Sequence, residues 1–578
     1  MSIIDWIVLS ATILSIILYG VWKSRGTHNI EGFLLADRQL PWYQVGLSVM
    51  ATQASAITFL SAPGQGFSDG MRFVQFYFGL PLAMVVLCIT FIPIFHKLNV
   101  YTAYEYLEKR FDSKTRALTA FLFLLQRGLS TGISIYAPAI ILSTILHIDV
   151  SYTTIATGVM VIFYTVYGGA KAVSYTQMFQ MAIIFAGLFM AGYMVVHLLP
   201  EHVGFTDALH IAGKMNRTRT IDTHFDINNR YNIWSGIIGG FFLQLSYFGT
   251  DQSQVGRYLT GKSIAQSRLG LVMNGLIKIP MQFLIVMIGT LVFAFYQYHT
   301  PPVFFNKTEL AKVEESPYRQ ELKKLETDYQ ALHTIKQQSV NKLVEALHHD
   351  DKITIDQMRT ELQQADGQAK TIRDSVIGLM KKNSPKAASD SFNDTNYVFL
   401  TFVTEYLPVG MIGLLVAIIF LASMGSIASG LNSLASSTII DFYIRYYKKE
   451  GTEKKYLSAS RWVTVAWGIF CIITSLYAGQ MGNLIEAVNI LGSLFYGTIL
   501  GIFLVAFYMK KIGGTSVFYA ALLTEVIVVV VWLLNIMAFL WLNVVGCLLV
   551  IIFAAIISEA RGDRLVERSA QLSIDSEE

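Results

Sequence analysis

A row of hydroxyl side chains inside a long apolar run is the first feature of this 578-residue chain that could bind a ligand. The hydroxyls belong to Ser426, Ser429, Ser433 and Ser436, and Ala422 precedes them on the same row. Spacings of four, three, four and three residues place all five on one face of a helix. Sodium prefers hard oxygen ligands, and hydroxyls next to freed backbone carbonyls supply them without a fixed charge. The row therefore predicts a sodium site, and hydroxyls that only hydrogen-bond to their own helix are the alternative.

A second apolar run, SVMATQASAITFLSAPG at residues 48–64, mixes small and polar side chains and ends in Pro63 and Gly64. This composition is typical of a membrane helix that is interrupted and lends backbone carbonyls to an ion. Close packing of helices through small residues explains the composition equally well.

Three ionisable residues lie deep inside apolar runs. Arg127 and Lys278 stand ten and nine residues inside their runs, about 14 Å into a membrane at 1.5 Å per residue. Charged groups are costly at that depth, so we expect at least one of the two to line a polar cavity. Glu525 is similarly deep, and it is either a structural partner or a protonatable site.

Helices that cross a membrane must hold these residues. One crossing takes about 20 mostly apolar residues, and the chain, with 53% hydrophobic residues and a mean hydropathy of +0.48, contains thirteen such runs. The predicted spans are 4–22, 43–67, 73–95, 117–146, 150–167, 174–199, 231–249, 269–296, 406–441, 456–478, 484–509, 516–535 and 536–558. The predicted fold class is an all-α integral membrane protein that crosses the lipid bilayer of the cell membrane many times.

Lys and Arg gather in alternate short loops, and this bias marks the cytoplasmic side. Examples are Lys23, Lys109, Lys171, Lys454 and Lys510. With thirteen spans, the N-terminus is predicted outside, and the C-terminus with its tail 559–578 is predicted inside. The net charge of +4 reflects this topology and gives no sign of a surface for nucleic acid.

Between Pro301 and Asp390 the composition changes to 14 Lys or Arg and 14 Asp or Glu. Apolar residues recur there at helical spacing on both sides of a turn at 348–352, where His348 and His349 would be solvated. Residues 301–395 are therefore predicted to form a helical hairpin outside the membrane, between the membrane domains 1–300 and 396–558. The hairpin is either an insertion without a transport role or a docking arm for a partner protein.

Five stretches resemble signatures of the sodium/solute symporter family, which includes sodium-coupled sugar, sialic acid, monocarboxylate, vitamin and iodide carriers. They are YGGAKAVSYTQMFQ (167–180), GTDQSQVGRYLT (249–260), YTAYEYLEKRF (101–111), IYAPA (135–139) and SIASGLNSLASSTIIDFY (426–443). The resemblance implies a LeuT-type fold, in which two inverted repeats of five helices are preceded by one helix and followed by two. The first core helix would be 43–67 and its repeat mate 231–249, and their broken middles would enclose the solute.

The resemblance also implies one sodium site, between the first and eighth core helices. Its residues would be Ala51, Ala54, Ala422, Gly425 and Ser426. A serine is common in the family at the position of Gly425, so one hydroxyl ligand is lost, and a water or Ser429 would replace it. Gln177 and Ala428 stand where relatives with a second sodium carry an Asp and a hydroxyl. A second sodium is therefore not expected, and proton coupling stays an alternative.

For the solute, the resemblance points first to sugar carriers. Gln244, Tyr247 and Lys278 align with positions that contact or gate the sugar, and Tyr247 would be the inner gate. Amide, phenol and ammonium groups give a polyol directional hydrogen bonds in a site with apolar walls.

Other positions resemble the acid-carrying branches of the family. Ser55, Thr58 and Phe73 align with contacts to sialic acid, and Arg127 lies about one turn from a carboxylate-binding arginine. Tyr136, within IYAPA, is similar to the monocarboxylate, vitamin and iodide branch. The full predicted solute site comprises Gln53, Ser55, Thr58, Phe73, Arg127, Gln244, Tyr247, Lys278 and Asn489.

The predicted function is sodium-coupled symport of a small polar organic solute by alternating access, with a sugar or a sugar acid favoured. A sodium- or proton-coupled carrier of a monocarboxylate, vitamin or anion is the alternative, and a membrane sensor that does not transport is a more distant one. An enzyme is not expected, because the sequence shows no metal-ligand pair, nucleophile elbow or phosphate loop.

Overall fold

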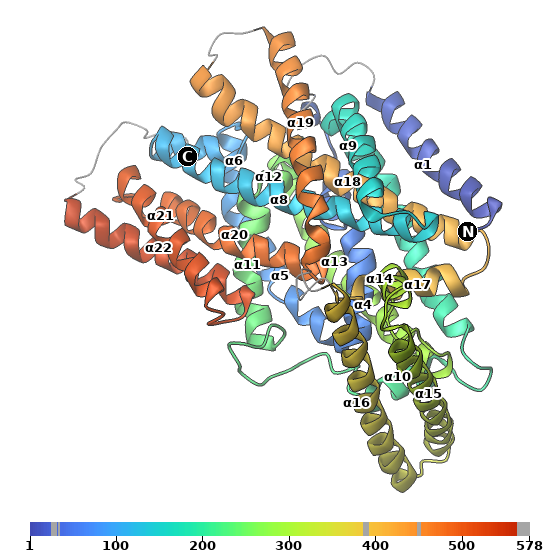
Figure 1. Ribbon diagram of the computed structural model, residues 1–578. Coiled ribbons are helices and arrows are strands. Elements are labelled where there is room, and N and C mark those ends of the chain that lie inside the picture. The colour runs from blue at the N-terminus through green and yellow to red at the C-terminus, as the bar shows by residue number, and fades with distance from the viewer. Residues whose placement is uncertain (25–31, 33–34, 385–391, 448–451, 563–578) are drawn as a thin grey trace.

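A computed structural model of the chain describes residues 1–24, 32, 35–384, 392–447 and 452–562. Within these ranges the chain forms a bundle of helices and no β-strand (Figure 1). Most of the predicted C-terminal tail, residues 563–578, and the side chains of residues 167–172 in the first signature lie outside what is described.

The helices follow one another with few irregular segments. The first half contains α1 Ile3–Ser24, α3 Trp42–Gln53, α4 Ala56–Asp69, α5 Leu80–Val86, α6 Ile92–Lys97, α7 Tyr104–Arg110, α8 Ser113–Leu146, α9 Val150–His197, α10 Phe205–Lys214, α11 Gly240–Thr250, α12 Gln252–Tyr258 and α13 Ile264–Tyr298. The second half contains α14 Lys307–Glu314, α15 Arg319–His348, α16 Lys352–Asn383, α17 Thr395–Tyr406, α18 Met411–Ser437, α19 Glu453–Leu476, α20 Leu484–Tyr508, α21 Gly514–Leu533 and α22 Phe539–Arg561. Short 3-10 and π segments extend several of these helices, as at Gly70–Tyr77 and Thr438–Tyr447.

Nine helical segments of the described chain are long and apolar enough to cross a membrane. They are Ala56–Lys97, Ser113–Leu146, Val173–His197, Ile264–Tyr298, Met411–Tyr447, Lys454–Gln480, Leu484–Tyr508, Gly514–Leu533 and Phe539–Arg561. Two shorter apolar segments, Ile3–Ile16 and Val150–Val166, coincide with further predicted spans. The all-helical membrane architecture is confirmed, while the count of thirteen spans and the orientation stay predictions.

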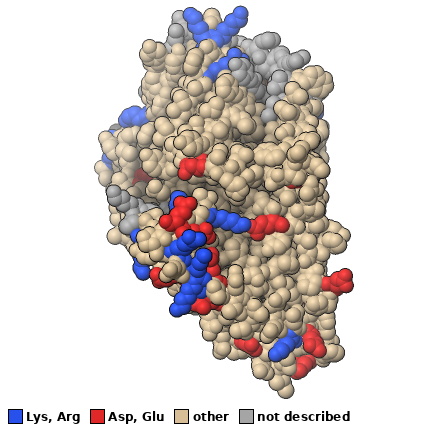
Figure 2. Space-filling model, turned by 45° about the vertical axis from the view of Figure 1, so that its right-hand side comes forward, with Lys and Arg blue, Asp and Glu red and all other residues tan. Residues whose placement is uncertain are grey.

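The outer surface fits this architecture. Figure 2 shows a broad surface with few charged side chains, with Lys and Arg gathered at its upper end. Charged side chains of both signs mix over the lower half of the same view. Large apolar side chains such as Leu18, Phe163 and Phe189 are more than 60% exposed, as expected of a surface that faces lipid.

Helix α9 is sharply bent near its middle. Residues separated by twelve positions in a straight helix would lie about 18 Å apart, yet the hydroxyls of Tyr164 and Thr176 are 2.8 Å apart. The two arms of α9 therefore meet where the sequence predicts a loop between the spans 150–167 and 174–199.

Helix α13 lies directly against the outer half of the first core helix. A Cβ atom on Gly289 would come within 1.9 Å of the carbonyl oxygen of Pro63 in α4, so the two backbones touch and only glycine fits. The contact fixes α4 against α13.

In the segment 301–384, α15 and α16 lie side by side and project from one end of the bundle (Figure 1), while the placement of a separate 301–395 hairpin outside the membrane stays a prediction. Ser339 on α15 donates to Glu361 on α16 at 2.9 Å. At the tip, His348 is half-exposed and lies 3.1 Å from Asp207 of α10, so it is a contact residue in addition to a turn residue. Docking of a partner protein on the hairpin stays a prediction.

His333 gives the attachment of the hairpin a pH dependence. Its Nε2 lies 2.9 Å from the carbonyl of Tyr296, to which it donates, and its Nδ1 lies 3.2 Å from the Thr300 hydroxyl. Burial lowers the pKa of His333 below its ordinary value of 6.5. The undocked hairpin then binds a proton more readily than the docked one, so docking weakens as the pH falls below about 6.5.

We expect amide hydrogen exchange in α15 to accelerate between pH 7 and pH 5, after correction for the intrinsic exchange rate. In His333→Gln, which has no titrating ring, the corrected exchange rate should be the same at both pH values. An equal acceleration in the variant would rule out His333 as the cause.

Candidate transport site

The first core helix is interrupted where α3 ends and α4 begins. Ala54 (φ −80°, ψ 78°) and Ser55 (φ −87°, ψ 172°) leave the helical conformation. Ser55 N–H donates to Gln53 O at 3.0 Å, so the carbonyl of Ala51 loses its regular donor four residues on. Thr58 N–H donates to Ser55 O at 3.0 Å, so the carbonyl of Ala54 loses its donor in the same way. Two backbone oxygens are freed, and both belong to predicted sodium ligands.

The repeat mate is interrupted at a different place from the one predicted. The segment 231–249 has no break in its middle, because a π turn at Ser235–Gly239 continues into α11 up to Thr250. The break lies at Asp251 (φ −79°, ψ 119°), whose carboxylate accepts from the N–H and the hydroxyl of Ser253 at 2.8 and 2.6 Å and caps α12. The apolar run ends at the point of the break, so hydropathy alone indicated the end of a span there.

A cavity of about 110 Å³ lies between the two interruptions. Its walls are Thr52, Gln53, Ser55, Ile57, Thr58, Phe76, Tyr77, Gln126, Arg127, Thr131, Ser134, Leu243, Gln244, Tyr247, Ser253, Ser426, Ile485, Val488, Asn489, Gly492 and Tyr496. Seven of the nine predicted solute residues line it, together with the predicted sodium ligand Ser426. Segments far apart in the sequence, from α3, α4, α8, α11, α18 and α20, therefore meet at one polar chamber.

Phe73 and Lys278, the other two predicted solute residues, are not among the lining residues. Phe73 stacks on Phe76, with ring centroids 5.8 Å apart. Lys278 is fully buried, and its Nζ lies 5.8 Å from the ring centroid of Tyr77. Since Phe76 and Tyr77 line the cavity, the two predicted residues stand one layer behind its wall. Glu525 lies on α21 and is not a lining residue either.

The guanidinium of Arg127 is neutralised within the protein. Its Nη2 forms an ion pair with Asp251 and donates to the Tyr496 hydroxyl at 2.9 Å. The Tyr496 hydroxyl in turn donates to Asp251 at 2.8 Å. The guanidinium also lies over the ring of Tyr247, whose hydroxyl accepts from Gln254 at 2.6 Å. Arg127 therefore joins the unwound segment at Asp251 to α8 and α20, and its charge is already paired.

Side-chain amides supply most of the free hydrogen-bonding capacity of the cavity. The carbonyl oxygens of Gln53, Gln126 and Gln244 are buried and have no hydrogen-bond partner in the described part of the chain. The amide nitrogen of Gln126 donates to Ser130 at 2.9 Å, which leaves its oxygen as the open end. Buried acceptors without donors are costly, so this cavity suits a solute that brings hydroxyl or N–H groups.

On α18, Ser426 points its side chain toward the cavity wall. Its hydroxyl donates to Ser423 O at 3.0 Å, and its oxygen lone pairs remain able to bind a cation. At Gly425 there is no room for a serine as the side chains stand, because a Cβ would lie 2.7 Å from Oε1 of Gln180. That amide oxygen is buried and has no hydrogen-bond partner among the described residues.

Gln177 connects three helices beside the predicted sodium site. Its amide nitrogen donates to Gly425 O at 3.2 Å, to Ser429 at 3.0 Å and to Thr52 at 3.3 Å. Its oxygen accepts from Ser48 at 2.7 Å. The hydroxyl of Ser429 itself donates to Gly425 O at 2.9 Å. Ser429 is therefore held in this network, and its replacement of the hydroxyl that Gly425 lacks stays a prediction.

Polar clusters join the helices on both sides of the cavity. Near the hairpin, Gln65 of α4 donates to Asp69 at 2.8 Å and to Glu486 at 3.1 Å, and Glu486 forms an ion pair with Arg230. Asn483 donates to the oxygen of Gln65 at 2.9 Å. The start of α20 is thereby attached to the outer half of the broken first helix.

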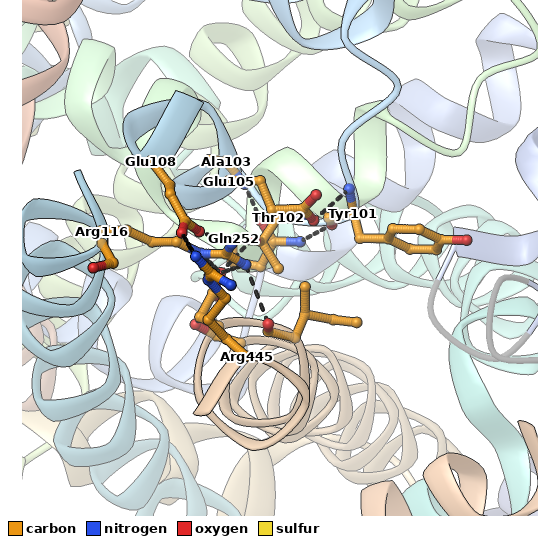
Figure 3. Close-up of polar contacts among 12 residues, drawn as sticks. Tyr101, Thr102, Ala103, Glu105, Glu108, Arg116, Gln252 and Arg445 are labelled. Carbon is orange, nitrogen blue, oxygen red and sulfur yellow. Dashed lines mark hydrogen bonds and ion pairs between the residues drawn. The ribbon is translucent and has the colours of Figure 1, made fainter. Parts of the chain in front are cut away.

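Beyond the C-terminal end of α18, Arg116 lies between two carboxylates (Figure 3). It donates to Asp441 at 2.7 and 2.9 Å and to Glu108 at 2.7 Å. Arg445 pairs with the other oxygen of Glu108. Gln252 of α12 donates to Tyr101 O at 2.8 Å and accepts from Ala103 N–H at 3.1 Å, which attaches the second half of the other broken helix to the same cluster.

A model of the sodium:solute symporter family matches residues 33–312 and 377–524. The chain belongs to this family. Members of the family are sodium-coupled membrane transporters and not enzymes, so the prediction that this chain is a sodium-coupled carrier of small solutes is confirmed.

Individual relatives place this symporter within a varied family. It is 33% identical to the human sodium/iodide cotransporter over 261 residues, which is 44% of this chain and 40% of that one. It is 26% identical to the sodium/glucose cotransporter of Vibrio parahaemolyticus over 525 residues, which is 88% of this chain and 82% of that one. Its fold is similar to that of a Na⁺-coupled sialic acid symporter solved in a substrate-bound outward-open state, with a TM-score of 0.73, 21% identity and coverage of 97% of this chain and 98% of that chain. This likeness confirms the LeuT-type fold.

Proposed function

We propose that this symporter carries a small polyhydroxylated solute, a sugar first, through the cavity between the two interrupted helices. The observation that supports the proposal is the pairing of Arg127 with Asp251 beside three open amide oxygens. A simple carboxylate brings no donor for these oxygens and meets no free guanidinium, whereas the hydroxyls of a sugar can donate to all three.

Sodium would bind between α3 and α18. The carbonyls of Ala51 and Ala54 are freed by the interruption, and α3 packs against α18, the helix that carries Ala422 and Ser426. The carbonyl of Ala422 and the hydroxyl of Ser426 complete a neutral oxygen set for a monovalent ion. Sodium held there would favour the conformation in which the two helices are closest, because a ligand shifts populations by its differential affinity.

Uptake into proteoliposomes tests the choice of solute. With an inward sodium gradient, radiolabelled glucose should be taken up, and unlabelled hexoses should compete more strongly than lactate or sialic acid. Competition by lactate alone would refute the proposal and favour the second candidate.

The second candidate is a carboxylate, and Lys278 is the observation in its favour. Its buried ammonium has no hydrogen-bond partner among the described residues and lies behind Tyr77. A rotation of Tyr77 would open it to the cavity. In this case Lys278→Met should remove carboxylate uptake and leave sugar binding unchanged.

Ser426→Ala should raise the sodium concentration for half-maximal uptake about tenfold, because it removes the one side-chain ligand of the proposed site. Ser433→Ala is the matched control: Ser433 lies on the same face two turns away, and its hydroxyl donates only to Gly430 O at 2.7 Å. Its sodium dependence should equal that of the parent. Equal sodium dependence in both variants would refute the placement of the ion.

A further inference from the structure

A second cavity, of about 240 Å³, lies where the hairpin meets the bundle. One wall comes from α15 and α16 of the hairpin, and the other from the outer ends of α4 and α13 and the segment after α10. None of its lining residues belongs to the transport cavity. It is therefore a separate chamber that exists only because the hairpin packs on the bundle.

Positive charge exceeds negative charge in its walls. Arg217, Lys336, Lys370 and Arg373 line the chamber with Asp366 as the one acidic lining residue among those described. The carboxylate of Asp366 is shared by two cations: its Oδ1 lies 3.0 Å from Nζ of Lys336, and its Oδ2 lies 3.6 Å from Nη2 of Arg217. Arg373 is paired outside the lining, with Asp394 at 2.8 Å. Lys370 has no acidic partner in the described chain, so Arg217 and Lys370 are incompletely neutralised.

Open hydrogen-bond donors, like the excess of positive charge, indicate an anionic ligand. The Nε of Arg217 and the hydroxyl of Tyr296 are buried and lack a hydrogen-bond partner among the described residues. Burial lowers the pKa of Arg217 below its ordinary value, which means that the charged form is poorly compensated. His333, also in the wall, has both ring nitrogens engaged and offers no further donor.

The rest of the wall is aromatic. Phe293 lies under the guanidinium of Arg217 at 4.9 Å, and Phe67 packs edge-on against Phe293 and Tyr296. A site with a cationic end and aromatic walls recognises an anion carried on an apolar body, because the charge is paired while the body is removed from water.

We propose that this chamber is a binding site for a small aromatic or apolar carboxylate, distinct from the transport site. Arg217 and Lys370 pair with the carboxylate, Tyr296 donates to it, and the aromatic side chains hold the body of the ligand.

The site is mechanically joined to the transport cavity through α4. Phe67 lines the chamber and Thr58 lines the transport cavity, nine residues or about 14 Å apart on one helix. The carbonyl of Arg217 accepts from Met71 N–H at 2.8 Å, just after Gly70 turns the chain with φ +73°. A carboxylate bound at Arg217 therefore stabilises one position of α4 and modulates transport without being carried.

Calorimetric titration of the purified full-length protein with benzoate tests the site. Benzoate should bind saturably, and benzyl alcohol, which has the same ring without the charge, should not. Arg217→Gln and Lys370→Ala should each weaken benzoate binding about tenfold. Lys342→Ala, an exposed lysine of α15 outside the chamber, should bind as the parent does.

Lys370 is exposed on α16, so its replacement leaves the fold intact even if Arg217→Gln proves unstable. The proposal is overturned if benzoate fails to bind saturably, if benzyl alcohol binds equally well, or if Lys370→Ala binds benzoate with parental affinity. The last result would place the benzoate elsewhere, including in the transport cavity.

Discussion

Asp251→Asn is expected to lower solute uptake at least 100-fold. The variant removes the one carboxylate that is paired with Arg127 among the described residues. The side chain of Asp251 is fully buried, and that of Arg127 is only 12% exposed. Removing one partner of a buried ion pair costs about 3–5 kcal/mol, because the other charge stays buried and uncompensated. The cost falls on the contact that joins the unwound segment at Asp251 to α8 and α20 in the wall of the cavity. Initial uptake rates in proteoliposomes measure the effect.

Asp149→Asn is the matched control for this variant. Asp149 also caps a helix, with its carboxylate accepting from Ser151 N–H at 2.8 Å, and an asparagine can keep such a cap. Among the described residues, no arginine forms an ion pair with Asp149. Uptake should therefore stay within about twofold of the parent. Parental uptake in Asp251→Asn would show that the Arg127–Asp251 pair has no part in transport.

Asp441→Asn should open the closed end of the bundle beyond α18. Asp441 is fully buried and holds Arg116 through two donors, and it also accepts from Thr102 at 2.8 Å and from Ser437 at 2.6 Å. Loss of its charge costs the closed state about 3 kcal/mol, which changes the ratio of open to closed molecules about 100-fold. A cysteine placed at Ser134, in the cavity wall, should then be alkylated much faster from that side. The native Cys88, Cys471 and Cys547 are buried and contribute little background.

Arg445→Gln in the same Ser134→Cys protein separates this effect from a general loss of surface charge. Arg445 pairs with Glu108 but is 41% exposed, and exposed pairs contribute at most about 1 kcal/mol. Its alkylation rate should rise less than tenfold. Equal rates in the two variants would show that the buried Asp441 does not hold the closed state.

The helical membrane fold could be predicted from local sequence patterns. Long apolar runs define spans by length, so the helices α8, α13, α18 and α20 fall close to the predicted ranges. The bend in α9 lies between Tyr164 and Thr176, where small and polar residues interrupt the apolar run. The hairpin is predictable for a similar reason, since its apolar residues recur at helical spacing in a charged segment.

The site could be predicted only in part, because contacts between distant helices leave little mark on a local pattern. Small and polar residues in the run 48–64 predicted an interrupted helix, but the break lies at Ala54 and Ser55, and α4 continues through Pro63 and Gly64. The break at Asp251 was missed, although an aspartate at the end of an apolar run, followed by a serine two residues on, is a helix-cap signal. Arg127 lines the cavity, as expected of at least one of the two deep cations, but its partner Asp251 is 124 residues away and is evident only in the fold.

For Phe73 and Lys278, the position along a helix is not sufficient to predict whether the side chain lines the cavity. Phe73 and Lys278 are fully buried, yet they pack behind Phe76 and Tyr77 and are not among the residues that line the cavity. Spacing along a helix gives the direction of a side chain but not the number of layers between it and a cavity.

Reciprocal coupling between sodium and solute tests most directly whether the freed carbonyls at Ala51 and Ala54 bind an ion next to a solute in the same chamber. Equilibrium binding of ²²Na⁺ to the purified protein is measured with and without saturating glucose, and binding of labelled glucose with and without sodium. Thermodynamic linkage requires that the two affinities rise by the same factor, and we expect a factor of about 10 or more that is lost in Ser426→Ala. Sodium binding that does not change with glucose, or glucose binding that is equally tight without sodium, would contradict the account.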